Sequence, residues 1–223
     1  MKEQNNLLSD TKKRIIETAG NIFAESGFQN TTVREICKQA GVNIAAINYH
    51  FGDKKGLYLA VIKYGKDTAF QKYPLNVGSD KASSPEERLK DFVSRFIGRV
   101  RGWHEGEIPW LRKLIARELL RPTEGLDMVA EEVVKPIFKT LSAIVRELLG
   151  SRATEDTVNL CCASIIGQSI FFLHAQPMIK RLFPSNNYID TKLIADHITR
   201  FSLNAIKQFA AHKKGDRRWT FSI

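Results

Sequence analysis

One stretch of the chain combines very small side chains with hydrogen-bonding ones, a pattern typical of a helix that contacts another molecule. It reads GVNIAAINYHF, residues 41–51, and contains no lysine, arginine, aspartate or glutamate. Ala45 and Ala46 would let a helix backbone approach its partner closely. The hydrogen-bonding side chains are Asn43, Asn48, Tyr49 and His50.

Start and stop signals around this stretch predict two short helices joined by a turn. Thr32 and Glu35 form a capping box, in which the threonine hydroxyl accepts a hydrogen bond from the amide of Glu35. Gly41 is placed to end that helix. Asn43 can cap the next helix, which covers residues 44–50.

Two short helices joined by a glycine-containing turn form a helix-turn-helix, whose second helix enters the major groove of DNA. There, alanine methyls can touch thymine methyls, and the polar side chains can bond base edges or phosphates. Lys54 and Lys55, in the first turn of the following helix, suit a phosphate better than their own helix dipole. The predicted DNA contacts are Thr31, Thr32, Asn43, Ile44, Ala45, Ala46, Asn48, Tyr49, His50, Lys54 and Lys55.

Two of these contacts have alternatives. Tyr49 is either a phosphate contact or a core aromatic that anchors its helix, and Lys54 is either a phosphate contact or a surface lysine. Cys37, Cys161 and Cys162 form no disulfide framework and are predicted to be buried thiols.

A family resemblance supports the DNA-binding interpretation. TTVREICKQAGVNIAAINYHFGDKKGLYLAVI, residues 31–62, resembles the DNA-binding module of TetR-family repressors, and the resemblance continues upstream through RIIETAGNIFAESGF, residues 14–28. Asn48 departs from the tyrosine that the family often has there. Residues 117–138 are also similar to the C-terminal domain of the CecR-like subgroup, regulators of drug-sensitivity and transport genes. The resemblance implies a homodimer with N-terminal DNA-binding domains and C-terminal ligand-binding and dimerisation domains.

The chain as a whole is predicted to be all-α, with about nine helices. We place the DNA-binding domain at residues 1–52 and the ligand-binding and dimerisation domain at 53–223. Residues 157–179 carry no charge, but their polar groups favour a buried helix over a membrane span. The N-terminus lacks the apolar core of a secretory signal, so a cytoplasmic, reducing location is expected.

Net charge alone does not locate the DNA contacts. The chain carries +10, yet residues 1–55 hold eight Lys/Arg against six Asp/Glu. The basic tail at residues 213–218 is either a solvated helix end or an extra anionic contact. The sequence contains no phosphate-binding loop, no dinucleotide fingerprint and no metal-ligand spacing among its histidines and cysteines. An enzyme, a cofactor and a metal are therefore not predicted.

An effector pocket is expected in the C-terminal domain. Aromatic residues lie on the helices expected around the long helix from Asp53 to about residue 73, whose tilt could carry a signal to the DNA contacts. Several polar residues lie in or beside apolar faces, where an organic effector could be their partner. The predicted lining residues are Phe92, Phe96, Trp103, Trp110, Arg117, Glu118, Phe138, Gln168, Phe171 and His174.

These patterns predict a repressor that binds a palindromic operator as a homodimer and is released by a small hydrophobic or drug-like effector. Helices around residues 161–173 and 194–209 show apolar residues on more than one side, which favours dimerisation through them. Two alternatives stay open. One is a constitutive DNA-binding protein whose C-terminal domain only dimerises, and the other is an α-helical small-molecule carrier.

Overall fold

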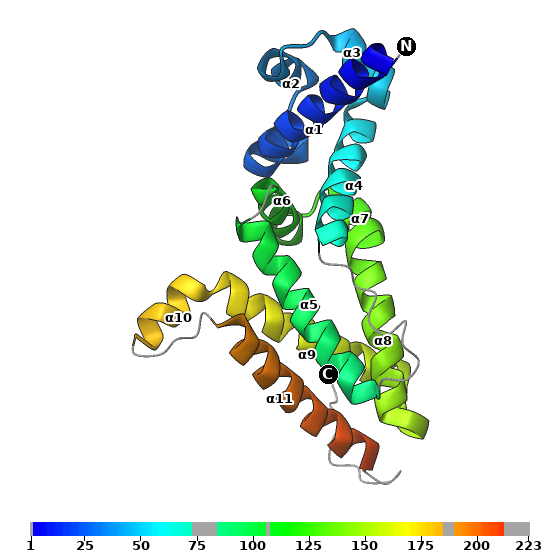
Figure 1. Cartoon of the computed structure of the whole chain (residues 1–223), viewed down its shortest axis with the longest axis vertical. Helices are drawn as coiled ribbons and strands as arrows, with labels where there is room; N and C mark the ends of the chain where they lie inside the picture. Colours follow the sequence, from blue (N-terminus) through cyan, green and yellow to red (C-terminus); the bar gives the residue numbers. More distant parts are fainter. Residues whose placement is uncertain (1, 73–83, 106–107, 185–189, 212–223) are drawn as a thin grey trace. The chain divides into compact units, whose positions relative to one another are not determined.

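The structure is a computed structural model, and it describes residues 2–72, 84–105, 108–184 and 190–211 (Figure 1). Throughout those residues the regular elements are helical, which confirms the all-α prediction. If the consecutive segments α7, η1 and α8 are counted as one helix, the described residues form ten helices, close to the nine expected. The α-helices are α1 (Lys2–Asn30), α2 (Val33–Ala40), α3 (Ile44–Phe51), α4 (Lys54–Lys72), α5 (Pro85–Glu105), α6 (Pro109–Leu120), α7 (Gly125–Val129), α8 (Lys135–Leu149), α9 (Glu155–His174), α10 (Gln176–Leu182) and α11 (Thr191–Ala211). They are supplemented by a π-helical turn, η1 (Ala130–Val134), and a 3-10 turn, η2 (Gly150–Arg152).

The chain divides into two compact units. The first unit comprises residues 1–72 and 99–136, and the second comprises residues 73–98 and 137–223. These units describe packing, and the functional division into 1–52 and 53–223 stays a prediction. The composition of residues 73–83, with Pro74, Asn76 and Gly78, predicts a loop at the domain boundary, but these residues lie outside the described ones. The basic tail at 213–218 and the side chain of Trp103 also lie outside them.

The predicted capping groups around the two short helices are in place. The amide of Glu35 donates to Thr32 Oγ1 at 3.2 Å, and the amide of Ala46 donates to Asn43 Oδ1 at 2.9 Å. Gly41 ends α2 with a φ of 63°, a conformation that glycine adopts without steric cost. Local sequence signals therefore fix where α2 and α3 begin and where α2 ends.

Pro136 falls within a helical sequence pattern at residues 126–149, where a proline is expected to kink or divide the helix. The structure accommodates it with η1. The amide of Lys135 donates to the carbonyl of Ala130, five residues earlier. Proline lacks an amide and its ring clashes with the carbonyl four residues back, so a wider π-turn beside it relieves both problems. The helical path consequently continues from α7 into α8.

The proline- and asparagine-rich composition of residues 176–189 predicts a loop. That prediction is wrong for its first part, because residues 176–182 form α10. Pro177 lies in the first turn of that helix, where the missing amide has no intrahelical partner to lose. Residues 185–189 of the predicted loop lie outside the described residues.

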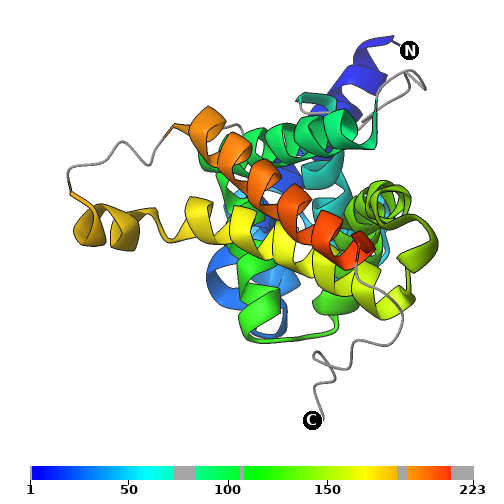
Figure 2. The same cartoon turned by 90° about the horizontal axis from the view of Figure 1, so that it is seen from below.

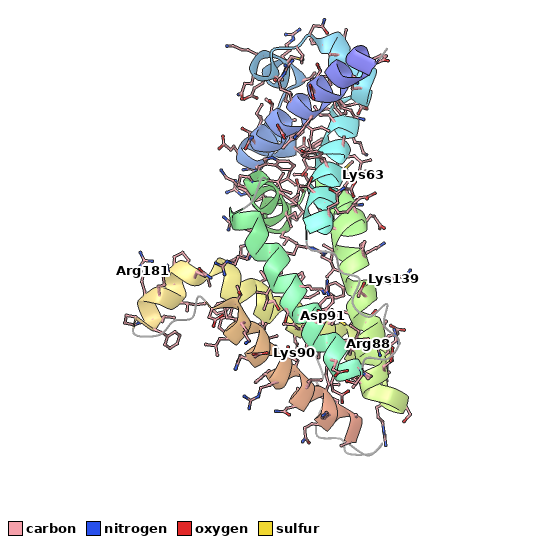
Figure 3. All side chains as sticks on the ribbon, viewed as in Figure 1. Lys63, Arg88, Lys90, Asp91, Lys139 and Arg181 are labelled. Carbon is pink, nitrogen blue, oxygen red and sulfur yellow. The ribbon has the colours of Figure 1, made fainter. Side chains whose placement is uncertain are left out.

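Each unit has its own core. In the first unit, Phe23 of α1 and Tyr58 of α4 meet edge to face, with ring centroids 4.8 Å apart. In the second unit, Phe92 of α5, Leu141 of α8 and Ile198 of α11 are fully buried. At the surface of that unit, Arg88 and Lys90, labelled on α5 in Figure 3, form ion pairs with Glu147 of α8 and, at 3.3 Å, with Asp196 of α11.

Helix α9 contains the uncharged residues 157–174, and its two cysteines are buried as predicted. Burial raises the pKa of both thiols. Among the described residues, no individual helix has the length and apolar composition needed to cross a membrane. The bent pair formed by 155–172 and 176–182 meets those two criteria jointly.

Candidate nucleic-acid interface

Helix α3 presents one exposed face and is anchored by the other. Ile47 has no exposed surface and points into the core of the first unit. Ile44 is 44% exposed and Tyr49 is 78% exposed, so Tyr49 is not the core aromatic that was considered as an alternative. Of the other predicted contacts on or beside α3, Asn43, Ala45 and Asn48 are exposed, and Ala46 and His50 are half-buried.

The two threonines before α2 differ in their surroundings. Thr32 is exposed and caps α2. Thr31 is only 1% exposed, and its hydroxyl donates to the carbonyl of Gly27 at 2.8 Å. Thr31 therefore helps to hold the turn before α2.

Cys37 on α2 is buried as predicted, and burial raises the pKa of its thiol.

Lys54 combines protein contacts with a position next to the exposed face. Its ammonium donates to the carbonyls of Phe28 at 3.0 Å and Thr31 at 3.2 Å, and it lies 4.5 Å from the centroid of the Phe28 ring. An ammonium carries three N–H groups, so one is left for a phosphate. Lys55 is exposed and lies 3.6 Å from Glu124 of the same unit.

Sequence reasoning missed a second source of positive charge near α3. Lys12 of α1 lies over the ring of Phe51, 6.0 Å from its centroid, at the C-terminal end of α3. Lys12, Lys13 and Arg14 are consecutive and exposed. Counting charges on the polar side of α1 would have revealed this cluster, but only the fold shows that it adjoins α3.

The predicted effector residues of the first unit have partners within the protein. Trp110 of α6 is 4% exposed and packs so closely on α1 that a Cβ at Gly20 would lie 2.6 Å from its ring. Glu118 is 1% exposed and accepts from the hydroxyl of Tyr58 at 2.7 Å. Arg117 donates to backbone carbonyls of α1.

The predicted effector residues of the second unit lie in different surroundings. Phe92 and Phe96 are buried and stack with centroids 6.0 Å apart. Phe138 is half-buried, and Phe171 is 55% exposed. Gln168 donates to the carbonyl of Ser164, four residues earlier on α9. His174 Nδ1 lies 3.1 Å from the carbonyl oxygen of Ile170.

The second unit also contains an open groove of about 520 Å³ between α9 and α11, two helices that lie side by side in Figure 2. Of the predicted effector residues, the groove includes Gln168. Its lining is mostly apolar, with Leu160, Phe201 and Phe209 on its walls. The part of the chain that the structure describes holds no cluster of three or more His, Cys, Asp or Glu residues able to bind a metal ion.

A short exposed helix behind a capped turn, on an all-α chain, defines a helix-turn-helix DNA-binding protein, and comparison with known families agrees. The family profile described as "Bacterial regulatory proteins, tetR family" matches residues 15–61. The profile described as "HTH-type transcriptional dual regulator CecR, C-terminal domain" matches residues 85–206. The chain belongs to the TetR family of transcription regulators, with a C-terminal part of the CecR type, and is not an enzyme.

Individual relatives agree with this assignment. The chain is 30% identical to the HTH-type transcriptional dual regulator CecR of Shigella flexneri, over 72% of this chain and 74% of that protein. It is 25% identical to the uncharacterised regulator YuxN of Bacillus subtilis, over 69% of this chain and 51% of that protein.

Solved structures of lower identity show the same fold. A TetR-family regulatory protein from Rhodococcus RHA1 has a TM-score of 0.59 at 20% identity, covering 88% of this chain and 96% of that one. FadR from Bacillus subtilis, solved with stearoyl-CoA, has a TM-score of 0.59 at 19% identity, covering 86% of this chain and 97% of that one.

Proposed function

We propose that this regulator represses transcription by binding a palindromic operator as a homodimer, and that a small hydrophobic or drug-like effector releases it. The observation that carries the proposal is the division of α3 into a buried anchor at Ile47 and an exposed, uncharged face. A helix that enters the major groove needs this division, because the anchor holds its angle while small residues let the backbone approach the bases.

Phosphate contacts would come from the groups that surround α3. The exposed Lys55, the remaining N–H of Lys54 and the cap at Thr32 lie at helix N-termini, where amides and the helix dipole favour anions. Lys12 and its neighbours on α1 add charge near the other end of α3. These contacts would position α3 on any sequence, whereas base readout would come from α3 itself.

The face formed by α9 and α11 is the proposed dimer interface. Leu160, Phe171, Phe201 and Phe209 are 69%, 55%, 59% and 46% exposed on these two helices. Leu160, Phe201 and Phe209 line the groove between the two helices. Exposed apolar side chains are costly in water, and a second copy of the same surface would cover them. A two-fold dimer through this face would pair two α3 helices, which a palindromic operator requires about 34–36 Å apart.

The effector part of the proposal is supported by the type of regulator. The C-terminal match is to a dual regulator, and FadR from Bacillus subtilis, a protein of this fold, was solved in complex with stearoyl-CoA. The pocket predicted from sequence stays a prediction, because its residues fall in both units and the described groove includes only Gln168 among them.

A binding selection tests the proposal. The wild-type protein is incubated with random-sequence duplex DNA, and the enriched duplex is measured by fluorescence anisotropy. We expect a palindromic consensus, and we expect Ala45→Glu to abolish its binding because a carboxylate would meet phosphates and close-packed base edges. Ala143→Glu, at an exposed position on α8, is the matched control and should bind as wild type does.

Adding compounds to the bound complex separates the alternatives. Stearoyl-CoA and a panel of hydrophobic drugs serve as probes, and release of DNA by any of them supports effector control. Stable binding in the presence of all of them favours the constitutive DNA-binding protein. Absence of any enriched duplex, together with binding of an apolar probe, favours the small-molecule carrier.

A further inference from the structure

The C-terminal end of α1 is held from outside by a side chain of α6. Arg117 donates from Nη1 to the carbonyl of Glu25 at 2.8 Å and from Nη2 to the carbonyl of Ser26 at 2.8 Å. Gly27, with φ 81° and ψ 166°, interrupts the helix, so Glu25 and Ser26 lie in the last turn before the break. The Ser26 carbonyl also accepts from the side chain of Asn30 at 3.2 Å. Carbonyls in such a turn lack backbone amide partners and carry partial negative charge. A planar guanidinium that bonds two of them therefore fixes both the position and the direction of this helix end.

The same turn also accepts hydrogen bonds from Thr31, which lies within it, and from Lys54, the first residue of α4. Thr31 Oγ1 donates to the carbonyl of Gly27 at 2.8 Å, and Lys54 Nζ donates to the carbonyls of Phe28 and Thr31. Between residues 25 and 31, five carbonyl oxygens thus accept side-chain hydrogen bonds, from α6, from α4 and from the turn itself.

Arg117 can approach the end of α1 only because residue 27 has no side chain. The φ of Gly27 is +81°, a conformation that L side chains rarely adopt. A Cβ at this position would also lie 2.5 Å from Nε of Arg117. The absence of a side chain at Gly27 therefore serves both the bend at the end of α1 and the approach of α6.

The residue after Arg117 fixes α6 to a second helix. Glu118 accepts from the hydroxyl of Tyr58 on α4 at 2.7 Å and from the amide of Thr123 at 3.1 Å. Both Tyr58 and Glu118 are 1% exposed, so water does not compete for this hydrogen bond. Adjacent residues of α6 thus contact the two helices that flank the helix-turn-helix.

We propose that Arg117 is a positioning residue for DNA recognition. From α6 it sets the end of α1, and through the turn at 27–32 it sets the angle at which α2 and α3 are presented to the groove. The inference rests on the proposed function in one respect, namely that α3 reads the operator. It assigns Arg117 to the DNA-binding apparatus instead of to an effector pocket.

The exposure of these contacts separates a positioning role from a purely structural one. The bond to Glu25 is exposed and the bond to Ser26 is half-buried, so water can take over both carbonyls when the guanidinium is removed. Loss of Arg117 should therefore lower the stability without unfolding the protein. What water cannot replace is the fixed geometry between α6 and the end of α1.

The test compares sequence-specific with non-specific binding. The variant Arg117→Met is measured against the duplex that wild-type protein selects and against a scrambled duplex of the same composition. We expect roughly tenfold weaker binding to the selected duplex, in the range that coupled networks transmit. Binding to the scrambled duplex should be unchanged, because it depends on phosphate contacts alone. Arg117→Lys should recover part of the loss.

A neighbouring lysine provides a matched control. Lys113 also reaches from α6 to α1, but only as an exposed ion pair, 3.5 Å from Glu25 Oε1. Exposed pairs contribute little, so Lys113→Met should bind both duplexes as wild type does. Hydrogen exchange without DNA should be faster in α2 for Arg117→Met than for Lys113→Met.

Three outcomes would overturn the inference. Wild-type discrimination by Arg117→Met would remove the positioning role while leaving the proposed function intact. An equal loss on both duplexes would assign Arg117 to folding alone. A wild-type protein that enriches no duplex would overturn the proposed function, and this inference with it.

Discussion

Replacing Lys54 with methionine tests two roles of one side chain, namely the hydrogen bonds that it donates in the turn before α2 and its predicted contact with a phosphate. The ammonium donates to two backbone carbonyls. Lys54 also lies in the first turn of α4, where a contact with a DNA phosphate is predicted. Methionine keeps the apolar stem over the Phe28 ring but removes the charge and the hydrogen-bond donors. The variant therefore tests the turn before α2 and the phosphate contact in the same molecule.

The magnitudes follow from the contacts. A hydrogen bond from a charged donor contributes about 1.5–3 kcal/mol, and water can reach these half-buried carbonyls once the lysine is gone. We therefore expect a loss of about 2 kcal/mol, which lowers the Tm of a chain of this length by about 4–8 °C. If the third N–H meets a phosphate, the slope of log affinity against log salt should also fall by about 0.9 per protomer.

Two measurements on one preparation decide between the roles. Thermal unfolding followed by circular dichroism reports the carbonyl contacts, and anisotropy titrations at several salt concentrations report the phosphate contact. Lys55→Met is the control for stability, because Lys55 is exposed and its partner Glu124 lies 3.6 Å away. An unchanged Tm would refute the role in the turn, and an unchanged salt slope would refute the phosphate contact.

Three further perturbations have defined outcomes. Gly27→Ala should lower the stability measured by urea unfolding by about 1–3 kcal/mol, because it places a Cβ at positive φ and 2.5 Å from Arg117 Nε. An unchanged urea midpoint would contradict the close approach of Arg117 to residue 27. Phe201→Asp should give a monomer in sedimentation at micromolar concentration, whereas Leu120→Asp, at an 82% exposed position in the first unit, should stay dimeric. Lys66 lowers the pKa of Glu132 below its usual 4.5. The ion pair should therefore stabilise the protein above pH 4.5 and lose its effect as the pH falls through the lowered pKa. A Glu132→Gln variant whose stability depends on acid as that of the wild type does would rule this out.

The parts of the fold that sequence reasoning predicted well depend on near neighbours along the chain. Thr32 and Asn43 cap amides three residues away, and Gly41 ends the helix that directly precedes it. The role of Arg117 was out of reach for the same reason, because its carbonyl partner in Ser26 lies 91 residues away. The proline and asparagine content of residues 176–189 predicts a loop, although a proline in the first turn, as Pro177 is in α10, starts a helix equally well.

Arg117 and Glu118 do need partners, as was predicted, but they find them within the protein and not in an effector. Arg117 and Glu118 were chosen because polar groups beside apolar helix faces need partners. The structure supplies those partners from the protein, since the end of α1 accepts from Arg117 and the hydroxyl of Tyr58 donates to Glu118. Sequence alone could identify the need for a partner but not its source.

The contacts along α4 bear on how a signal could reach the DNA. Tilting of α4 by itself was expected to be the lever, yet α4 is joined to the helices after it at successive points. Lys55 pairs with Glu124, and the Tyr58 hydroxyl donates to Glu118. Further along, Glu132 of η1 accepts from Lys66 at 2.8 Å, and Lys63, labelled on α4 in Figure 3, lies 3.5 Å from it.

Because these contacts are distributed along α4, a tilt of that helix alone would break the buried hydrogen bond between Tyr58 and Glu118 and separate the lysines of α4 from their glutamate partners. Moving α4 together with α6, α7 and η1 would preserve all of them. Arg117 would then carry the same displacement into the end of α1, so both sides of the helix-turn-helix would shift as one. An effector that releases DNA is therefore expected to act on the segment 109–134 and not on α4 by itself.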